Sequence, residues 1–150
     1  GDAWFVGPSA SLPEIAPCAR FYQQACREAG KGEGEVALFR YLFVARTTKE
    51  AITAAGESFI QAFERMYFRW PHPVVKRPAG ELTIERLAED RIIFGDPKTC
   101  IQEIIRFRNE LAAEHLVCRF SVPGIPREDC QTSLDLFTRE VMPALRAEAP

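Results

Sequence analysis

The chain has 150 residues, of which 47% are hydrophobic and 27% are charged, and its formal net charge is -2. This length allows one domain with a hydrophobic core, and the composition is that of an ordinary soluble globular protein. The slight acidic excess argues against a nucleic-acid-binding surface, and no apolar run approaches the roughly 20 residues that span a membrane.

The five cysteines are an odd number, are scattered along the chain and include no Cys-x-x-Cys pair. Because most of them occupy apolar periodic positions, we expect reduced core residues of a cytoplasmic protein. The start of the chain shows no signal-peptide pattern. Only His72 and His115 offer nitrogen ligands for a metal, so we expect no zinc site.

The first predicted elements are a short strand over residues 3–6 and a helix after Ser11. Ser11 is a preferred N-cap residue, Pro13 suits the first helical turn, and Gly30 is a natural stop at the other end. Apolar residues recur at helical spacing between them. This part of the chain therefore predicts a strand followed by an amphipathic helix.

Residues 35–45 predict the clearest strand of the chain. They are almost continuously apolar, as expected for a strand that is covered on both faces. Thr47 and Glu50 then fit a capping box at the start of a second amphipathic helix. Pro71 and Pro73 end that helix.

The second half of the chain predicts two further helices, one more strand and a final helix. A short helix is expected near residues 83–89, and Asp96, which a proline follows, begins a longer one. Residues 115–122 predict the last strand. The final helix begins near Glu128, and Pro143 should bend or fray its last turns. The alternation of strands and helices predicts a parallel sheet.

The chain resembles the luciferase-like flavin-dependent monooxygenases, which are (β/α)8 barrels. The resemblance rests on the order and spacing of four segments: the opening Asp2-Ala3-Trp4-Phe5, residues 43–45 followed by Glu50-Ala51, Gly95-Asp96-Pro97, and the last strand and helix at residues 115–146. A closed barrel of this type needs about 250 residues. The resemblance therefore implies a single α/β domain over residues 1–150, the C-terminal portion of a TIM barrel with about three parallel strands and flanking helices.

Members of this family use reduced flavin, either FMN or a deazaflavin, and the FMN-dependent members use dioxygen to oxidise a small organic substrate. The resemblance thus implies a segment of a flavin-dependent monooxygenase, in which the cofactor carries the chemistry. In many relatives, part of the flavin-phosphate site precedes the strand matched by Trp4 and Phe5. We therefore do not expect this chain alone to bind flavin tightly. The alternative is a stand-alone, non-catalytic α/β module that oligomerises or binds a small ligand.

Active sites of such barrels lie at the C-terminal ends of the strands. In the last strand, Val117, Arg119 and Ser121 share one face, and the apolar residues between them share the other. Arg119 and Ser121 are therefore expected at the barrel mouth, in contact with the flavin or with an anionic substrate. A structural ion pair is the alternative for Arg119, because a charge in a barrel needs a partner.

Two other strands supply candidate residues. Arg46 stands at the C-terminal end of the middle strand and is predicted to bind the cofactor. Arg40, near the start of that strand, is expected to pair with an acidic residue at the other end of the barrel. Trp4 and Phe5 are predicted to wall a flavin pocket, with plain core packing as the alternative.

Residues 71–95 take the place of an inserted segment that covers the substrate in the family. The resemblance implies a lid in this region, with Lys76 and Arg77 as substrate-binding residues. The alternative for these two cations is an ordinary solvated loop.

Part of a barrel leaves open sheet edges and an apolar inner face. Val117, Leu42 and Val44 are the residues expected on that face. Open edges recruit other chains, and exposed apolar faces become interfaces. We therefore expect a homodimer or a higher homo-oligomer that buries this face.

Overall fold

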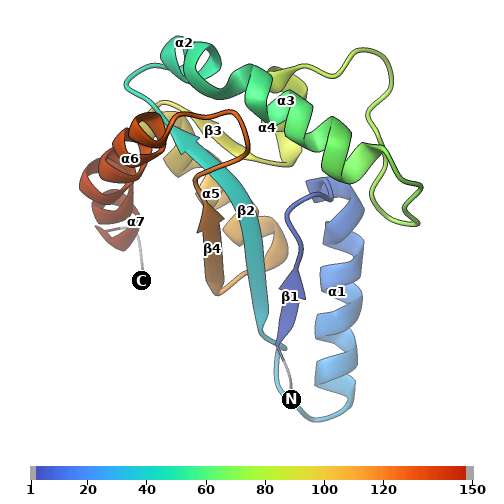
Figure 1. Ribbon diagram of the computed structural model, residues 1–150. Coiled ribbons are helices and arrows are strands. Elements are labelled where there is room, and N and C mark those ends of the chain that lie inside the picture. The colour runs from blue at the N-terminus through green and yellow to red at the C-terminus, as the bar shows by residue number, and fades with distance from the viewer. Residues whose placement is uncertain (1–2, 148–150) are drawn as a thin grey trace.

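The computed structural model describes residues 3–147, and Figure 1 shows a sheet with helices around it. The strands found in these residues are β1 (Trp4–Val6), β2 (Val36–Val44), β3 (Ile93–Gly95) and β4 (His115–Arg119). Each of the other strands pairs with β2 in parallel. The predicted parallel sheet with flanking helices is therefore confirmed.

The long strand β2 is the centre of the sheet, and its neighbours pair with different parts of it. β1 pairs with residues 36–38, β4 with residues 37–41, and β3 with residues 42–44. Because β1 and β4 share two partner residues, they lie on opposite edges of β2. The sequence pattern does not predict β3, since three residues are too few to show a periodicity. β4 ends at Arg119, earlier than predicted.

The helices alternate with the strands in the predicted order. They are α1 (Leu12–Glu28), α2 (Thr48–Ala51), α3 (Glu57–Phe63), α4 (Ile84–Asp90), α5 (Pro97–Leu111), α6 (Arg127–Leu136) and α7 (Met142–Ala147). Short π-helical segments, η1 (Ile52–Gly56), η2 (Glu64–Phe68) and η3 (Phe137–Val141), join pieces into continuous helical runs over residues 48–68 and 127–147. The irregularity expected near Pro143 is η3, which ends two residues before it, because a proline ring disturbs the preceding turn.

Polar side chains cap the N-termini of three of these helices, as the sequence predicts. The Ser11 amide donates to Oε2 of Glu14 over 2.7 Å. Thr47 Oγ1 accepts a first-turn amide of α2 at 3.1 Å, and Asp96 Oδ1 accepts the Thr99 amide of α5 at 3.0 Å. These contacts satisfy groups that have no partner within the helix itself.

Replacing Asp96 with alanine should lower the free energy of unfolding by about 1 kcal/mol, the usual cost of losing an N-cap. The hydrogen bond from the Thr99 amide lowers the pKa of Asp96. The carboxylate therefore stabilises the fold fully above its unfolded-state pKa of about 3.9, and this contribution is lost as the pH falls through the lower folded-state value. Urea denaturation of both proteins at pH 7 and pH 3 checks this. An equal loss at the two pH values would contradict it.

The two faces of β2 lie in two different cores, because successive side chains of a strand point to opposite faces. The first core joins one face to α1 and α5, and its strand residues are Val36, Leu38, Leu42 and Val44. The second core joins Tyr41 and Phe43 to α3, α4 and β3. The predicted place of Leu42 and Val44 on an open inner face is therefore wrong, since helices cover both.

All five cysteines are free thiols. Cys100 is buried and Cys118 is half-buried, and burial raises the pKa of the Cys118 thiol to about 12. Cys18 is exposed, so the expected core position does not hold for it. Within residues 3–147, no helix is long and apolar enough to cross a membrane.

Candidate functional site

One part of the sheet is left without a helix over it. The helical run that begins with α2 crosses the carboxyl end of β2, whereas the lower part of the sheet remains open in front (Figure 1). Phe5 is 56% exposed and Val117 is 45% exposed on this part. The ring of Phe39 lies 6.1 Å from that of Phe5 and 5.9 Å from that of Tyr41. We call Phe5, Phe39, Val117 and Arg119 the open face, and the buried Tyr41 lies at its upper end.

Arg119 lies at the upper end of the open face, beside Tyr41. The two residues are partners in the β2–β4 register, and the guanidinium carbon lies 5.6 Å from the centre of the Tyr41 ring. Arg119 Nε donates to the carbonyl of Ser121 at 3.0 Å. Neither an ion pair nor an acceptor for its two terminal nitrogens is found within residues 3–147.

The alternation predicted for the last strand is confirmed. Val117, Arg119 and Ser121 are exposed, whereas Leu116 and Cys118 are half-buried against the first core. The parity of a strand fixes this arrangement before any contact is known. It places Arg119 on the same side of the sheet as Val117, whereas Ser121 lies beyond the end of β4.

Two tyrosine hydroxyls meet above Arg119. The Tyr41 and Tyr67 oxygens are 2.8 Å apart, and Tyr67 comes from η2, where it packs against the second core. Burial, together with the hydrogen bond to Tyr41, raises the pKa of Tyr67. The Tyr67 hydroxyl therefore stays protonated at neutral pH. Neither tyrosine stands out in the sequence, since their meeting depends on how the helical run of residues 48–68 folds back.

Trp4 and Phe5 do not lie together. Trp4 pairs with Val36 in the sheet and stacks against Tyr22 of α1, with ring centres 5.9 Å apart. Phe5 points to the other face, beside Phe39. The structure thus brings only Phe5 to the open face, and places Trp4 among the residues that pack against the first core.

Arg46 is exposed at the carboxyl end of β2 but belongs to a different hollow. That hollow has a volume of about 180 Å³ and lies between the start of the helical run of residues 48–68 and α6. Glu50, Asp129 and Thr132 also line it. No contact joins Arg46 to Arg119 among the described residues, so the structure separates these two predicted cofactor ligands.

Arg40 is completely buried on the helix side of the sheet. Its two terminal nitrogens donate to the carbonyls of Gly7 at 2.9 Å, Phe39 at 2.9 Å and Ala10 at 3.1 Å, and its guanidinium lies 4.8 Å from the Phe107 ring centre. Burial, with neighbouring Arg91, lowers the pKa of Arg40 to about 9. The structural role is as predicted, but the expected acidic partner is wrong: carbonyl oxygens hold this charge.

The loop with Lys76 and Arg77 makes polar contacts with two neighbouring helical segments. The Lys76 amide donates to Oε1 of Glu14 in α1 at 2.7 Å, and Arg77 forms an ion pair with Glu64. Both cations line a hollow of about 330 Å³ together with Arg91. Of the predicted lid, residues 71–83 are loop, whereas α4 and β3 contribute to the second core.

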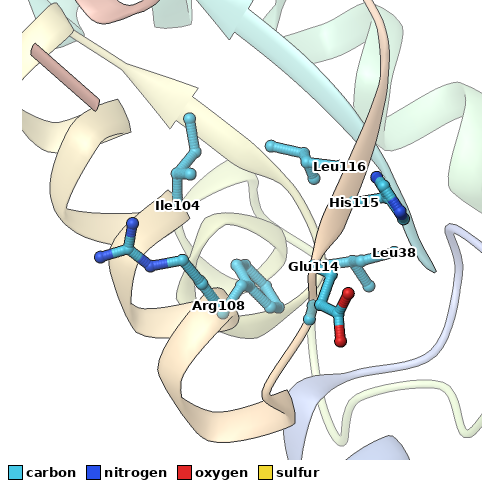
Figure 2. Close-up of a pocket in the computed structure, with 8 residues that line it drawn as sticks. Leu38, Ile104, Arg108, Glu114, His115 and Leu116 are labelled. Atoms are coloured by element: carbon cyan, nitrogen blue, oxygen red, sulfur yellow. The ribbon is translucent and has the colours of Figure 1, made fainter. Parts of the chain in front are cut away.

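A further hollow lies at the opposite end of the sheet, between α5 and the start of β4 (Figure 2). Its volume is about 80 Å³, which is small beside the roughly 300 Å³ or more of typical ligand pockets. At its rim, Glu114 and His115 form with Glu35 a group whose ligand atoms lie within 4.8 Å of one another, and all three residues are exposed. The expectation that the chain has no metal site stays a prediction.

No family model and no curated protein matches the sequence. Solved structures do match. The monooxygenase RslO1 from Streptomyces bottropensis has a TM-score of 0.70 and 20% identity, covering 95% of this chain and 42% of that one. The oxygenating constituent of 3,6-diketocamphane monooxygenase from Pseudomonas putida, solved with FMN, has a TM-score of 0.66 and 21% identity, covering 93% and 41%. Riboflavin lyase RcaE has a TM-score of 0.59, 14% identity and covers 98% and 39%.

The chain has the fold of part of these luciferase-like flavin enzymes. The resemblance seen in the sequence is thereby confirmed at the level of the fold. The chain spans about two-fifths of the length of the matched structures, from 39% to 42%.

Proposed function

We propose that this chain forms part of a flavin-dependent monooxygenase of the luciferase-like kind, and that the open face lines the interior of its barrel. The observation that carries the proposal is the row of aromatic rings on the open face, with the unpaired Arg119 at its upper end. The fold similarity supports the same assignment. The substrate of such an enzyme is a small organic molecule.

The open face offers a flavin both apolar contact and a positive charge. Phe5 and Phe39 offer apolar ring surface to a planar ring system, and the terminal nitrogens of Arg119 are free to bind an anionic oxygen. Either FMN or a deazaflavin meets these requirements. When bound, a reduced flavin supplies the electrons that activate dioxygen, while the protein binds, orients and shields it.

The remaining strands of the barrel would have to come from sequence outside these residues. A barrel of this type needs about 250 residues, and the matched structures are more than twice as long as the chain. The open face of this chain is one wall of a pocket, so its contacts with a flavin are one-sided. We therefore propose that the chain alone binds flavin weakly, and that full affinity needs the rest of the barrel.

Titration of the isotopically labelled chain with FMN, followed by NMR, tests this proposal. We expect binding weaker than about 100 μM, a binding free energy of about -5.5 kcal/mol, with shift changes in β4 and in the neighbouring part of β2. Arg119→Ala should remove them. Arg139→Ala is the matched control, because Arg139 is an exposed arginine on the final helix. Titrations at several protein concentrations show whether self-association competes.

Two results would overturn the proposal. One is an absence of any shift change on the open face at millimolar FMN, which would leave the non-catalytic module as the better account. The other is binding centred on Arg46, which would move the flavin to the hollow beside α6.

A further inference from the structure

Tyr41 and Tyr67 form a hydrogen bond at the upper end of the open face. The burial of the two residues decides which hydroxyl is the donor. Tyr41 is 1% exposed, and its hydroxyl has Tyr67 as its hydrogen-bond partner. Tyr67 is only half-buried and is thus the more accessible of the two. The two hydroxyls share one hydrogen bond, so one of the two protons must find another acceptor or water.

The buried hydroxyl is the one that donates. If Tyr67 donated to Tyr41, the Tyr41 proton would be enclosed without an acceptor, at a cost of about 1–3 kcal/mol. If Tyr41 donates instead, its proton is satisfied and the Tyr67 proton remains free. That proton then points toward the accessible side, where solvent or a ligand can accept it.

Arg119 supplies a charge beside this free donor. Its guanidinium lies against the Tyr41 ring, and it is the charged residue whose field acts on the Tyr67 hydroxyl. Its two terminal nitrogens have no acceptor within the described residues, as set out above. Two kinds of donor, a guanidinium and a phenol, therefore border the same end of the open face, and no described carboxylate pairs with the guanidinium.

We propose that Arg119 and Tyr67 together bind one anionic group, a carboxylate or a phosphate, of a ligand whose planar apolar body lies along Phe5 and Phe39. A charge-assisted hydrogen bond from Arg119 supplies most of the affinity, and the Tyr67 hydroxyl fixes the position of the anionic oxygen. This inference rests on the proposed function, because the ligand occupies the face assigned to the barrel interior. It adds the chemical class of the ligand and a role for Tyr67.

Two sources of the anionic group are open, the phosphate of FMN or a carboxylate on the substrate, and paired ligands distinguish them. Benzoate and benzamide are flat and similar in size, but only benzoate is charged. FMN and riboflavin share the ring system, but only FMN carries the phosphate. A preference for FMN over riboflavin assigns the phosphate to the site. A preference for benzoate over benzamide without an FMN preference assigns a substrate carboxylate.

NMR titration of the intact chain with these four probes tests the inference. We expect benzoate to bind at least tenfold more tightly than benzamide, with shift changes centred on Tyr41, Tyr67 and Arg119. Arg119→Ala should abolish this preference, and Arg119→Lys should retain part of it because the charge remains. Tyr67→Phe should weaken benzoate about tenfold, the effect of one hydrogen bond to a charged group, and leave benzamide unchanged.

The controls separate binding from folding. Tyr22→Phe removes a hydroxyl from the α1 side of the sheet, and Arg139→Ala removes an exposed arginine, so both should leave the preference for benzoate intact. Melting temperatures identify any variant that has lost its fold. Equal affinities within both ligand pairs, benzoate with benzamide and FMN with riboflavin, would overturn the inference. A Tyr67→Phe variant that binds the preferred anionic ligand as well as the parent would also overturn it.

The inference and the proposed function fail in different ways. If benzoate binds through Arg119 and Tyr67 but neither FMN nor riboflavin perturbs the open face, the anion site stands and the flavin assignment falls. If FMN perturbs the open face equally in the parent and in Tyr67→Phe and Arg119→Ala, the flavin assignment stands and the anion site falls.

Discussion

Replacing Arg40 with alanine should lower the free energy of unfolding by about 3–5 kcal/mol, a large part of the stability of a domain this size. The substitution leaves the carbonyls of Gly7, Phe39 and Ala10 without their donor. It also leaves a cavity next to the ring of Phe107, which now stacks against the guanidinium. Both the unpaired carbonyls and the cavity are costly in a fully buried position.

Urea denaturation of the parent and of Arg40→Ala measures this difference. Arg40→Met serves as the second variant, because it restores most of the lost volume but none of the hydrogen bonds. If the unpaired carbonyls cause most of the loss, Arg40→Met should recover little of the free energy of unfolding. If the cavity causes it, Arg40→Met should recover most of that free energy. Arg139→Ala, at an exposed position, should change the free energy of unfolding by less than about 0.5 kcal/mol. A loss below 1 kcal/mol for Arg40→Ala would show that water readily reaches these carbonyls.

The second large effect concerns self-association. We predict that the isolated chain forms a homodimer or a higher oligomer through the open face, because Phe5 and Val117 are 56% and 45% exposed on it and exposed apolar surface favours contact with another chain. Val117→Thr keeps a β-branched residue on β4, Phe5→Thr places one on β1, and both remove apolar surface. Each should weaken association about thirtyfold, which corresponds to about 2 kcal/mol for a residue at the centre of an interface.

Sedimentation velocity over a range of concentrations measures the association. The control is Phe21→Gln, since Phe21 is 74% exposed but lies on α1, away from the open face. A dimer that the strand variants leave intact and Phe21→Gln disrupts would place the interface on the outer helix. A parent chain that stays monomeric at high concentration would show that the open face tolerates solvent.

The sequence by itself determined the features that depend on local contacts. The nearly continuous apolar run of β2 predicts a strand that is covered on both faces. The caps at Ser11, Thr47 and Asp96 follow from hydrogen bonds that span three residues. The face of β4 on which the Arg119 side chain lies follows from the strict alternation of side chains along a strand. The resemblance to luciferase-like enzymes also rests on such local segments in a fixed order.

Only the tertiary structure decided which residues meet across the chain. Arg40 finds carbonyls 30 and 33 residues away rather than an acid, because the loop after β1 closes over it. Leu42 and Val44 face the helices of the first core. The register pairs Phe39 with Val117, so the face of Val117 is the one opposite to Leu42 and Val44. Tyr67 reaches Tyr41 across 26 residues because the helical run of residues 48–68 folds back over the sheet. Such contacts depend on strand register and helix packing, which no local pattern of residues records.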